Sequence, residues 1–420
     1  MTAGYWPSRW PGEDGGPDRR QLVGGGSGLG LMSGGRLEVV SREAMASTMV
    51  ILRMAGEVYL LRHTAGDDAV SWVERIDPVT LELIERSPDL PGGPTWPGGL
   101  AAHANGSLYV VFGNHAHRLA ADTSLVASRE LPRVRPYNSF VILDDGSIVT
   151  KDFAGRLPGQ SVEQGGRRES ELLVLEPDGL EIVARAELAE PSVARLSAAG
   201  SSVFVVGETS LIRVEWDGRS LAVDDGFVAP YRTLDGQTYG WDAVIAAGAA
   251  WFLDNGAGSE NYAGSFLGLG VSVAPLHLVR VDLVTGSVQL TEICGLPHGL
   301  VANPPVIDEE RGIAVGYDSS NGVLAAFDLD DGGVCGLRWR RRQLHASHLL
   351  LYPSTGELVT GDHDGARMMD QVVVLDISTG EELGRVDTGS PVQSVLFPAP
   401  GVGREIYTCS FTHVSRIAAT

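Results

Sequence analysis

Four aspartates close the same seven-residue pattern at separate places in the chain. Each segment opens on a glycine, continues through a mostly apolar run and ends on an aspartate six residues later; the four are Gly146–Asp152, Gly248–Asp254, Gly312–Asp318 and Gly356–Asp362. A carboxylate repeated in this way can hold a cation, act as a general base, or accept hydrogen bonds from the backbone of its own loop. The spacing alone leaves ligand contact and the structural role both open.

Amide and imidazole groups share a second position in the pattern. Aligning the repeats on their first turn places Asn138, Asn303 and His348 together, with Trp241 nearby. Carboxylates that converge need a cation, hydrogen bonds or raised pKa values, and Ca²⁺ or Mg²⁺ prefers oxygen ligands of this kind. We therefore predict a divalent metal site with Asn138, Asn303 and His348 as ligands. The residues predicted to contact a small-molecule substrate beside it are Trp241, Asp254, Asp318 and Asp362.

Histidines form a further candidate group. His298, His348, His363 and His413 all fall near strand starts or second-strand ends, and four imidazoles from separate repeats could hold Fe²⁺ or Zn²⁺. No HExxH or Cys-x-x-Cys spacing supports zinc, and a hydrogen-bonded structural role is favoured for any one histidine taken alone. We predict substrate contact for His298 and His413 and a catalytic role for His363.

Lys151 is the only lysine among 32 basic residues, and it directly precedes Asp152. A partly desolvated lysine can act as a base or as a Schiff-base nucleophile, which arginine cannot do. A surface ion pair with Asp152 would explain the same placement. We predict Lys151 and Asp152 as catalytic residues and keep the ion pair as the alternative.

Short strands must position these side chains. In one repeat, residues 138–144 precede an Asp145-Gly146 turn, and residues 147–150, 171–176 and 180–186 supply three more strands. Asp-Gly is a hairpin signal because both residues tolerate the positive φ of a tight turn. Eight such repeats begin near Thr48, Thr95, Pro136, Pro191, Tyr239, His298, Leu344 and Pro391.

Repeats of about 40 to 50 residues with four strands each are typical of a β-propeller. The last repeat lacks its fourth strand before the chain ends, and residues 35–40 could supply it and close the ring. We predict an all-β fold, a single β-propeller over residues 35–420 with eight four-stranded blades. Seven blades is the alternative, because residues 191–229 are irregular. Residues 1–34 are predicted as an N-terminal extension whose glycine cluster, residues 24–30, is a flexible linker.

The composition limits the kinds of partner that the protein can bind. The formal charge is 32 − 53 = −21, which disfavours binding to nucleic acid or to an anionic membrane. No apolar run is long enough for a transmembrane helix, and residues 1–22 lack the apolar stretch of a secretory signal. The three cysteines, Cys294, Cys335 and Cys409, fit a reducing compartment. We expect a cytoplasmic protein, and no motif indicates an organic cofactor.

Two glycine-rich insertions, residues 154–168 and 255–270, follow second strands on the face predicted for the site. Their composition would permit a mobile lid, although a plain surface loop fits equally.

The Asp-x-x-Thr-Gly turns at residues 282–286 and 376–380 resemble those of PQQ-like and YVTN-type propellers, over most of residues 36–420. Residues 136–146 more weakly resemble the inner strand of gluconolactonase and strictosidine-synthase-like propellers. In those families an asparagine at this position helps to bind a divalent ion in the central channel, which is the role that the resemblance implies for Asn138.

The sequence therefore predicts a small-molecule enzyme with its site on the channel face. A divalent ion would act as a Lewis acid toward a carbonyl in hydrolase or lyase chemistry of the lactonase-like kind. The alternative is a propeller that binds a ligand or a protein without chemistry.

Overall fold

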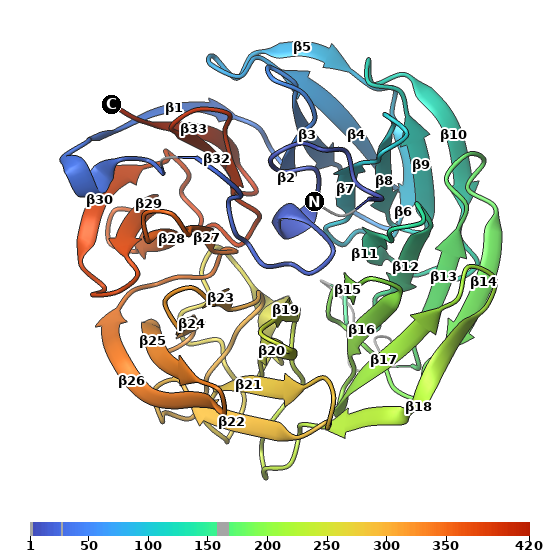
Figure 1. The fold of residues 1–420 in the computed structure, drawn as a ribbon. Coiled ribbons are helices and arrows are strands. Elements are labelled where there is room, and N and C mark those ends of the chain that lie inside the picture. Colours follow the sequence, from blue (N-terminus) through green and yellow to red (C-terminus); the bar gives the residue numbers. More distant parts are fainter. Residues whose placement is uncertain (1–2, 27, 158–167) are drawn as a thin grey trace.

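The computed structural model describes residues 3–26, 28–157 and 168–420, and it is a ring of eight antiparallel sheets around a central axis (Figure 1). The prediction of an eight-bladed β-propeller is confirmed, and the seven-bladed alternative is wrong because residues 191–229 form a complete four-stranded blade. Helical structure among the described residues is limited to three 3-10 turns, η1 (Glu13–Gly15), η2 (Leu31–Ser33) and η3 (Ser259–Asn261).

Blades are numbered in chain order, and the strands of each blade are given from the innermost to the outermost. The strands of blades one to four are β2 (Ser47–Leu52), β3 (Val58–His63), β4 (Ala69–Ile76) and β5 (Leu83–Arg86), with β6 (Leu90–Gly93) also paired to β4; β7 (Gly99–Ala102), β8 (Leu108–Phe112), β9 (His115–Leu119) and β10 (Leu125–Glu130); β11 (Tyr137–Ile142), β12 (Ile148–Asp152), β13 (Glu171–Leu175) and β14 (Ile182–Glu187); and β15 (Ser197–Ala199), β16 (Ser202–Val206), β17 (Ser210–Trp216) and β18 (Leu221–Pro230).

The strands of blades five to eight are β19 (Val244–Ala246), β20 (Ala249–Leu253), β21 (His277–Asp282) and β22 (Val288–Glu292); β23 (Val306–Asp308), β24 (Ile313–Asp318), β25 (Val323–Asp330) and β26 (Gly333–Arg342); β27 (Leu350–Tyr352), β28 (Glu357–Asp364), β29 (Met369–Asp376) and β30 (Glu382–Asp387); and β31 (Ala399–Pro400), β32 (Glu405–Cys409), β33 (His413–Ala419) and β1 (Leu37–Glu43).

The eighth blade joins the two ends of the propeller. Its outermost strand β1 pairs antiparallel with β33, in a register that runs from Leu37 opposite Ala419 to Glu43 opposite His413. The predicted closure by an N-terminal strand is thereby confirmed. This pairing places a strand from the N-terminal part of the chain in the same blade as the C-terminal strands and covers the outer edge of β33.

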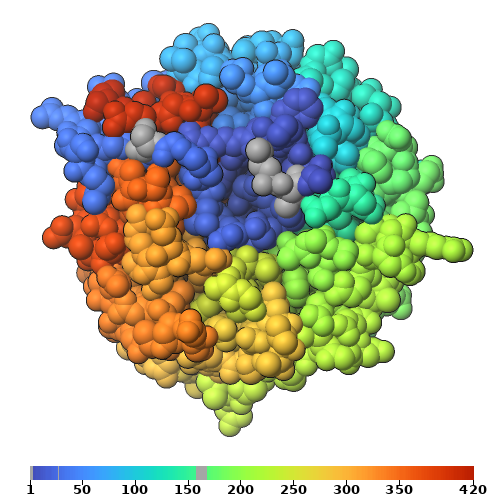
Figure 2. Space-filling view, viewed as in Figure 1, coloured from blue at the N-terminus to red at the C-terminus, as the bar shows by residue number. Residues whose placement is uncertain are grey.

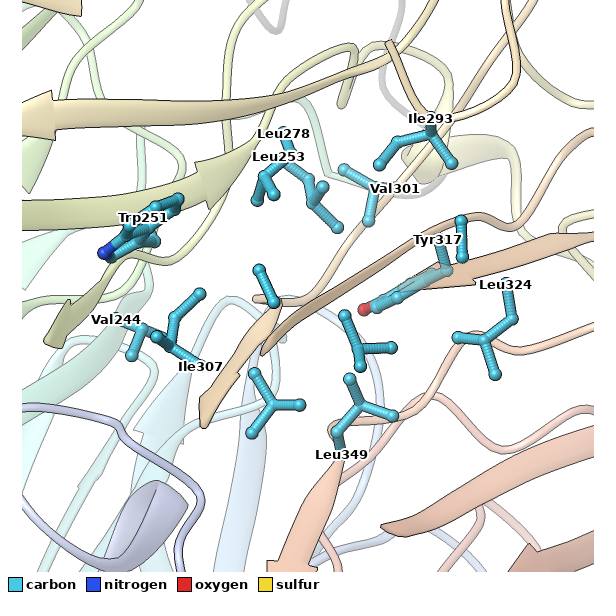
Figure 3. Close-up of a cluster of buried hydrophobic side chains, with 14 of the residues drawn as sticks. Val244, Trp251, Leu253, Leu278, Ile293, Val301, Ile307, Tyr317, Leu324 and Leu349 are labelled. Carbon is cyan, nitrogen blue, oxygen red and sulfur yellow. The ribbon is translucent and has the colours of Figure 1, made fainter. Parts of the chain in front are cut away.

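The core lies between neighbouring blades rather than inside any one of them. Figure 3 shows one such cluster, in which Trp251 of blade five, Tyr317 of blade six and Leu349 beside blade seven belong to the same buried group. The inner strands are buried on both faces, whereas the outer strands alternate buried and exposed side chains. Apolar runs therefore mark inner strands and alternation marks outer ones.

Residues 3–23, which we call the N-terminal segment, lie in the centre of the ring and cover the channel from the face seen in Figure 2, whereas η2 lies at the rim beside β30 (Figure 1). The backbone of the N-terminal segment bonds to the C-terminal ends of inner strands: Leu52 donates to the carbonyl of Trp10 (2.8 Å), and Ala198 to that of Pro17 (2.6 Å). Trp10 and Arg19 are each 1% exposed. The structure thus differs from the expected linker, because unpaired groups at the strand ends bind the segment. Within the predicted linker, Gly24, Gly25 and Gly26 are exposed, whereas Gly28 and Leu29 are buried.

No helix in the described ranges has both the length and the apolar character needed to cross a membrane.

Candidate functional site

The four repeated aspartates are bonded within their own blades. Asp254 accepts hydrogen bonds from the backbone N–H of His277 (2.6 Å) and from Nε2 of Gln237 (2.7 Å), and Asp318 accepts one from the N–H of Leu300 (3.2 Å). Asp152 accepts hydrogen bonds from the backbone N–H of Glu171 and from the side chains of Arg133 and Arg135. Asp362 accepts from the backbone N–H of Leu344 and from the side chain of Arg385. Each carboxylate ties a second strand to the third strand or to the loop that enters the blade. They do not converge on the channel.

Lys151 is fully buried but is not paired with the Asp152 carboxylate. Its Nζ donates to the backbone carbonyls of Asp152 (2.9 Å) and Ser192 (3.0 Å). Burial lowers the pKa of Lys151 to about 7, against the opposing influence of Asp152 and Asp242. His363, predicted to act with it, lies in β28 of blade seven, on the opposite side of the ring from β12 of blade three. The structure does not bring these predicted catalytic residues together.

His298 and His413 also lie apart from one another and from the channel. His298 is exposed and has a positive φ of 59°, while Nδ1 of His413 lies 2.9 Å from the hydroxyl of Thr412. Within the described ranges, no group of three or more His, Cys, Asp or Glu side chains is arranged to hold a metal ion.

A cavity of about 220 Å³, which we call the central cavity, lies on the channel face where the loops enter the blades. It brings together three of the predicted residues, namely Trp241, Asn303 and His348, which precede the inner strands of blades five, six and seven. Six of the residues that line it are Trp, Tyr or Phe, and we call them the aromatic wall; they are Trp96, Trp241, Tyr262, Phe266, Phe397 and Phe411.

The aromatic wall contains two nearly parallel indoles. The centroids of Trp96 and Trp241 are 6.5 Å apart with an interplanar angle of 14°, and Trp96 also stacks on Phe153 at 4.2 Å. Across the same cavity the imidazole of His348 stacks on Phe397 at 3.9 Å. These flat surfaces favour planar ligands, because offset stacking adds to the gain from burying apolar area.

Acidic side chains of the N-terminal segment lie behind the polar part of this wall. Oδ1 of Asp14 is 2.8 Å from Nδ1 of His348, a close contact without hydrogen-bond alignment, and Oδ2 accepts from Arg19 (2.9 Å). Burial alone would raise the pKa of Asp14, but His348 and Arg19 more than offset it and hold that pKa below its usual value. Glu13 accepts from Arg195 at 3.1 Å.

Arg195 links the cavity wall to three neighbouring blades. Its Nη1 donates to the carbonyl of Asn138 (2.5 Å), its Nη2 donates to that of Pro97 (2.9 Å), and its backbone N–H donates to Asp242 (2.6 Å). Asn138 therefore contributes its main chain here, while its side chain donates to the carbonyl of Val193 (3.1 Å).

The insertion at residues 255–270 covers the cavity, and its side chains are anchored. The hydroxyl of Tyr262 donates to the carbonyl of Gln393 (2.5 Å), and the N–H of Phe266 donates to Oε1 of Gln393 (2.9 Å). Arg156 of the other insertion pairs with Glu260 at 2.8 Å. The rest of that insertion, residues 158–167, lies outside the described residues.

Sequence reasoning missed several residues of the cavity. Arg195 and the aromatic residues sit in loops that carry no repeated motif, although Thr95-Trp96-Pro97 and Leu396-Phe397 are apolar runs just before inner strands. Glu13 and Asp14 lie in a polar stretch that has the composition of an exposed tail, so no local signal marked them.

No protein-family model matches the sequence, and no curated protein matches it either. Solved structures resemble the fold. BamB from Moraxella catarrhalis is 11% identical over 91% of this chain and 97% of its own, with a TM-score of 0.57. Quinohemoprotein alcohol dehydrogenase from Comamonas testosteroni is 10% identical over 98% of this chain and 81% of its own, with a TM-score of 0.64. The Dos1 propeller is 10% identical over 92% of this chain and 96% of its own, with a TM-score of 0.57. Identities this low establish the fold alone, which is the β-propeller predicted from the repeat and its turns.

Proposed function

We propose that this protein binds a small, planar, aromatic molecule in the central cavity. The observation that carries the proposal is the aromatic wall, in which the nearly parallel indoles of Trp96 and Trp241 face a cavity that also holds Arg195, Asn303 and His348. A mostly apolar pocket with a few convergent polar groups is the usual form of a small-molecule site.

The proposal is for binding, without the metal-assisted hydrolase or lyase chemistry expected from the sequence. Lys151, Asp152 and His363, the expected catalytic residues, are not among the residues that line the cavity. The carboxylates of Glu13 and Asp14 already accept from Arg19 and Arg195, which leaves few anionic oxygens for a hard cation. A charge of −21 also favours a small molecule over nucleic acid as the partner.

The experiment is a ligand-observed NMR screen with rigid bicyclic aromatic fragments against the full chain. Ala302 lines the cavity, so Ala302→Phe should fill it and abolish saturation transfer to the fragments. Ala222→Phe is the matched control, because Ala222 is exposed on the outer strand β18. Equal binding to wild type and Ala302→Phe would locate the fragments elsewhere and refute the proposal.

A second arm separates simple binding from metal-assisted chemistry. The screen is repeated after EDTA treatment and again with added Ca²⁺ or Mg²⁺. Unchanged affinities are expected if the aromatic wall carries the binding. Affinity that appears only with a divalent ion would favour the metal-dependent alternative.

A further inference from the structure

Charged side chains are buried behind the central cavity and pair with one another. Three carboxylates, those of Glu13, Asp14 and Asp242, are at most 6% exposed, and two guanidinium groups, those of Arg19 and Arg195, are buried with them. Arg19 pairs with Glu13 and Asp14, and Arg195 pairs with Glu13. Buried charges are tolerated when they are compensated in this way, so a further charge brought by a ligand would need a partner of its own.

His348 presents one ring nitrogen to the cavity. Nδ1 faces Asp14 at 2.8 Å, and the ring face lies on Phe397 at 3.9 Å, so Nε2 is the polar ring atom left for a ligand. A histidine ring nitrogen can form a hydrogen bond with a polar group of a ligand. His345 packs behind this loop against Tyr317 rather than toward the cavity.

Asn303 presents the complementary group. Its Nδ2 donates to the carbonyls of Ala346, two residues before His348, and of Val395 (3.0 Å). Both partners are acceptors, so these bonds identify Nδ2 and leave Oδ1 as the amide atom for the cavity. Oδ1 of Asn303, an acceptor, and a ring nitrogen of His348 thus belong to the lining of the same cavity.

We propose that the central cavity recognises a planar lactam, a ring in which a carbonyl stands next to an N–H. The carbonyl accepts from Nε2 of His348 and the ring N–H donates to Oδ1 of Asn303, while the aromatic wall stacks on the ring. A neutral ligand is expected, because the buried charges are already paired with one another and an ionised ligand would bring an uncompensated charge. This inference rests on the proposed binding function and assigns the chemical class of its ligand.

The test is calorimetric titration with three probes of one shape, quinolin-2(1H)-one, its N-methyl derivative and quinoline-2-carboxylate. The lactam should bind about tenfold more tightly than the N-methyl compound, which cannot donate to Asn303, and the carboxylate should bind more weakly than the lactam. Equal affinity of the lactam and the N-methyl compound would overturn the inference and leave the binding function standing. Failure of all three to bind would overturn the binding function itself.

Asn303→Ala separates recognition from a structural role. If the variant keeps the near-ultraviolet circular dichroism of the wild type, the tenfold preference for the lactam should vanish while the affinity for the N-methyl compound stays the same. Val284→Ala, at a position 90% exposed, is the control. A variant that retains the preference would contradict the assignment, and if Asn303→Ala does not fold, the three-probe comparison on wild type decides alone.

Discussion

Replacing the only lysine with methionine should stabilise this protein. Lys151 is completely buried, and no carboxylate of the described residues lies within ion-pair distance of its Nζ. Burial lowers its pKa from 10.5 to about 7, and the difference corresponds to about 5 kcal/mol of unfavourable free energy when the side chain is charged. Lys151→Met removes that cost and keeps most of the side-chain volume.

The substitution also removes two hydrogen bonds, but neither carbonyl is left alone. The carbonyl of Ser192 still accepts from the N–H of Ala154 (3.0 Å), and that of Asp152 still accepts from Ser170 at 3.5 Å. At about 1 kcal/mol for each lost bond, the net gain at pH 6 should be about 3 kcal/mol.

The pH dependence identifies the cause. The pKa of Lys151 is lower in the folded protein than in the unfolded chain, so at pH values between the two the unfolded chain carries a proton that the folded protein lacks. Below about pH 7 both states are protonated, and the free-energy cost of burying the charge is complete. As the pH rises from 7 toward 10.5, the advantage of Lys151→Met should shrink by about 1.4 kcal/mol per pH unit. Urea unfolding of both proteins at pH 6, 8 and 9.5 measures it. A variant less stable than wild type at pH 6, or a difference that does not change with pH, would refute the reasoning.

Three further predictions concern the residues around the site. Asp318→Ala should lower the free energy of unfolding by about 2 to 3 kcal/mol, because buried backbone N–H groups lose their acceptor, yet leave fragment affinity unchanged in calorimetry. Burial lowers the pKa of His117 from 6.5 to about 4, so the contribution of the neutral imidazole to stability is complete above pH 6.5 and falls by about 3 kcal/mol toward pH 4. His117→Gln should therefore flatten this part of the acid unfolding curve. Arg19→Leu should cost about 3 to 5 kcal/mol in urea unfolding by stranding two buried carboxylates, whereas Arg20→Leu, at a partly exposed pair, should cost less than about 1 kcal/mol.

The repeat made most of the fold predictable. Glycine turns and apolar inner strands recur in every blade, and the eight predicted starting points all lie within eight residues of an inner strand. Ring closure followed from the missing fourth strand of the last blade, since an unpaired edge has to be covered. The position of residues 3–23 could not be predicted in this way, because their partners are backbone groups at the ends of inner strands far away in sequence.

The candidate site was predictable only in part. Position within the repeat identified Trp241, Asn303 and His348, because residues just before an inner strand line the cavity in six of the eight blades. Position within the repeat also led us to expect ligand contact from the aspartates. A carboxylate at the end of a second strand instead faces the loop that enters its own blade, where backbone N–H groups donate to it. Asp14 could not be predicted in this way, because the N-terminal segment lies outside the repeats.

The most direct test of the account is a crystal structure of the protein with a bound bicyclic aromatic fragment. We predict that the fragment's ring lies in the central cavity, in contact with Trp96, Trp241 and Phe397, and that its polar edge faces Asn303 and His348. A fragment seated anywhere else on the propeller, with the central cavity holding only water, would contradict the central claim.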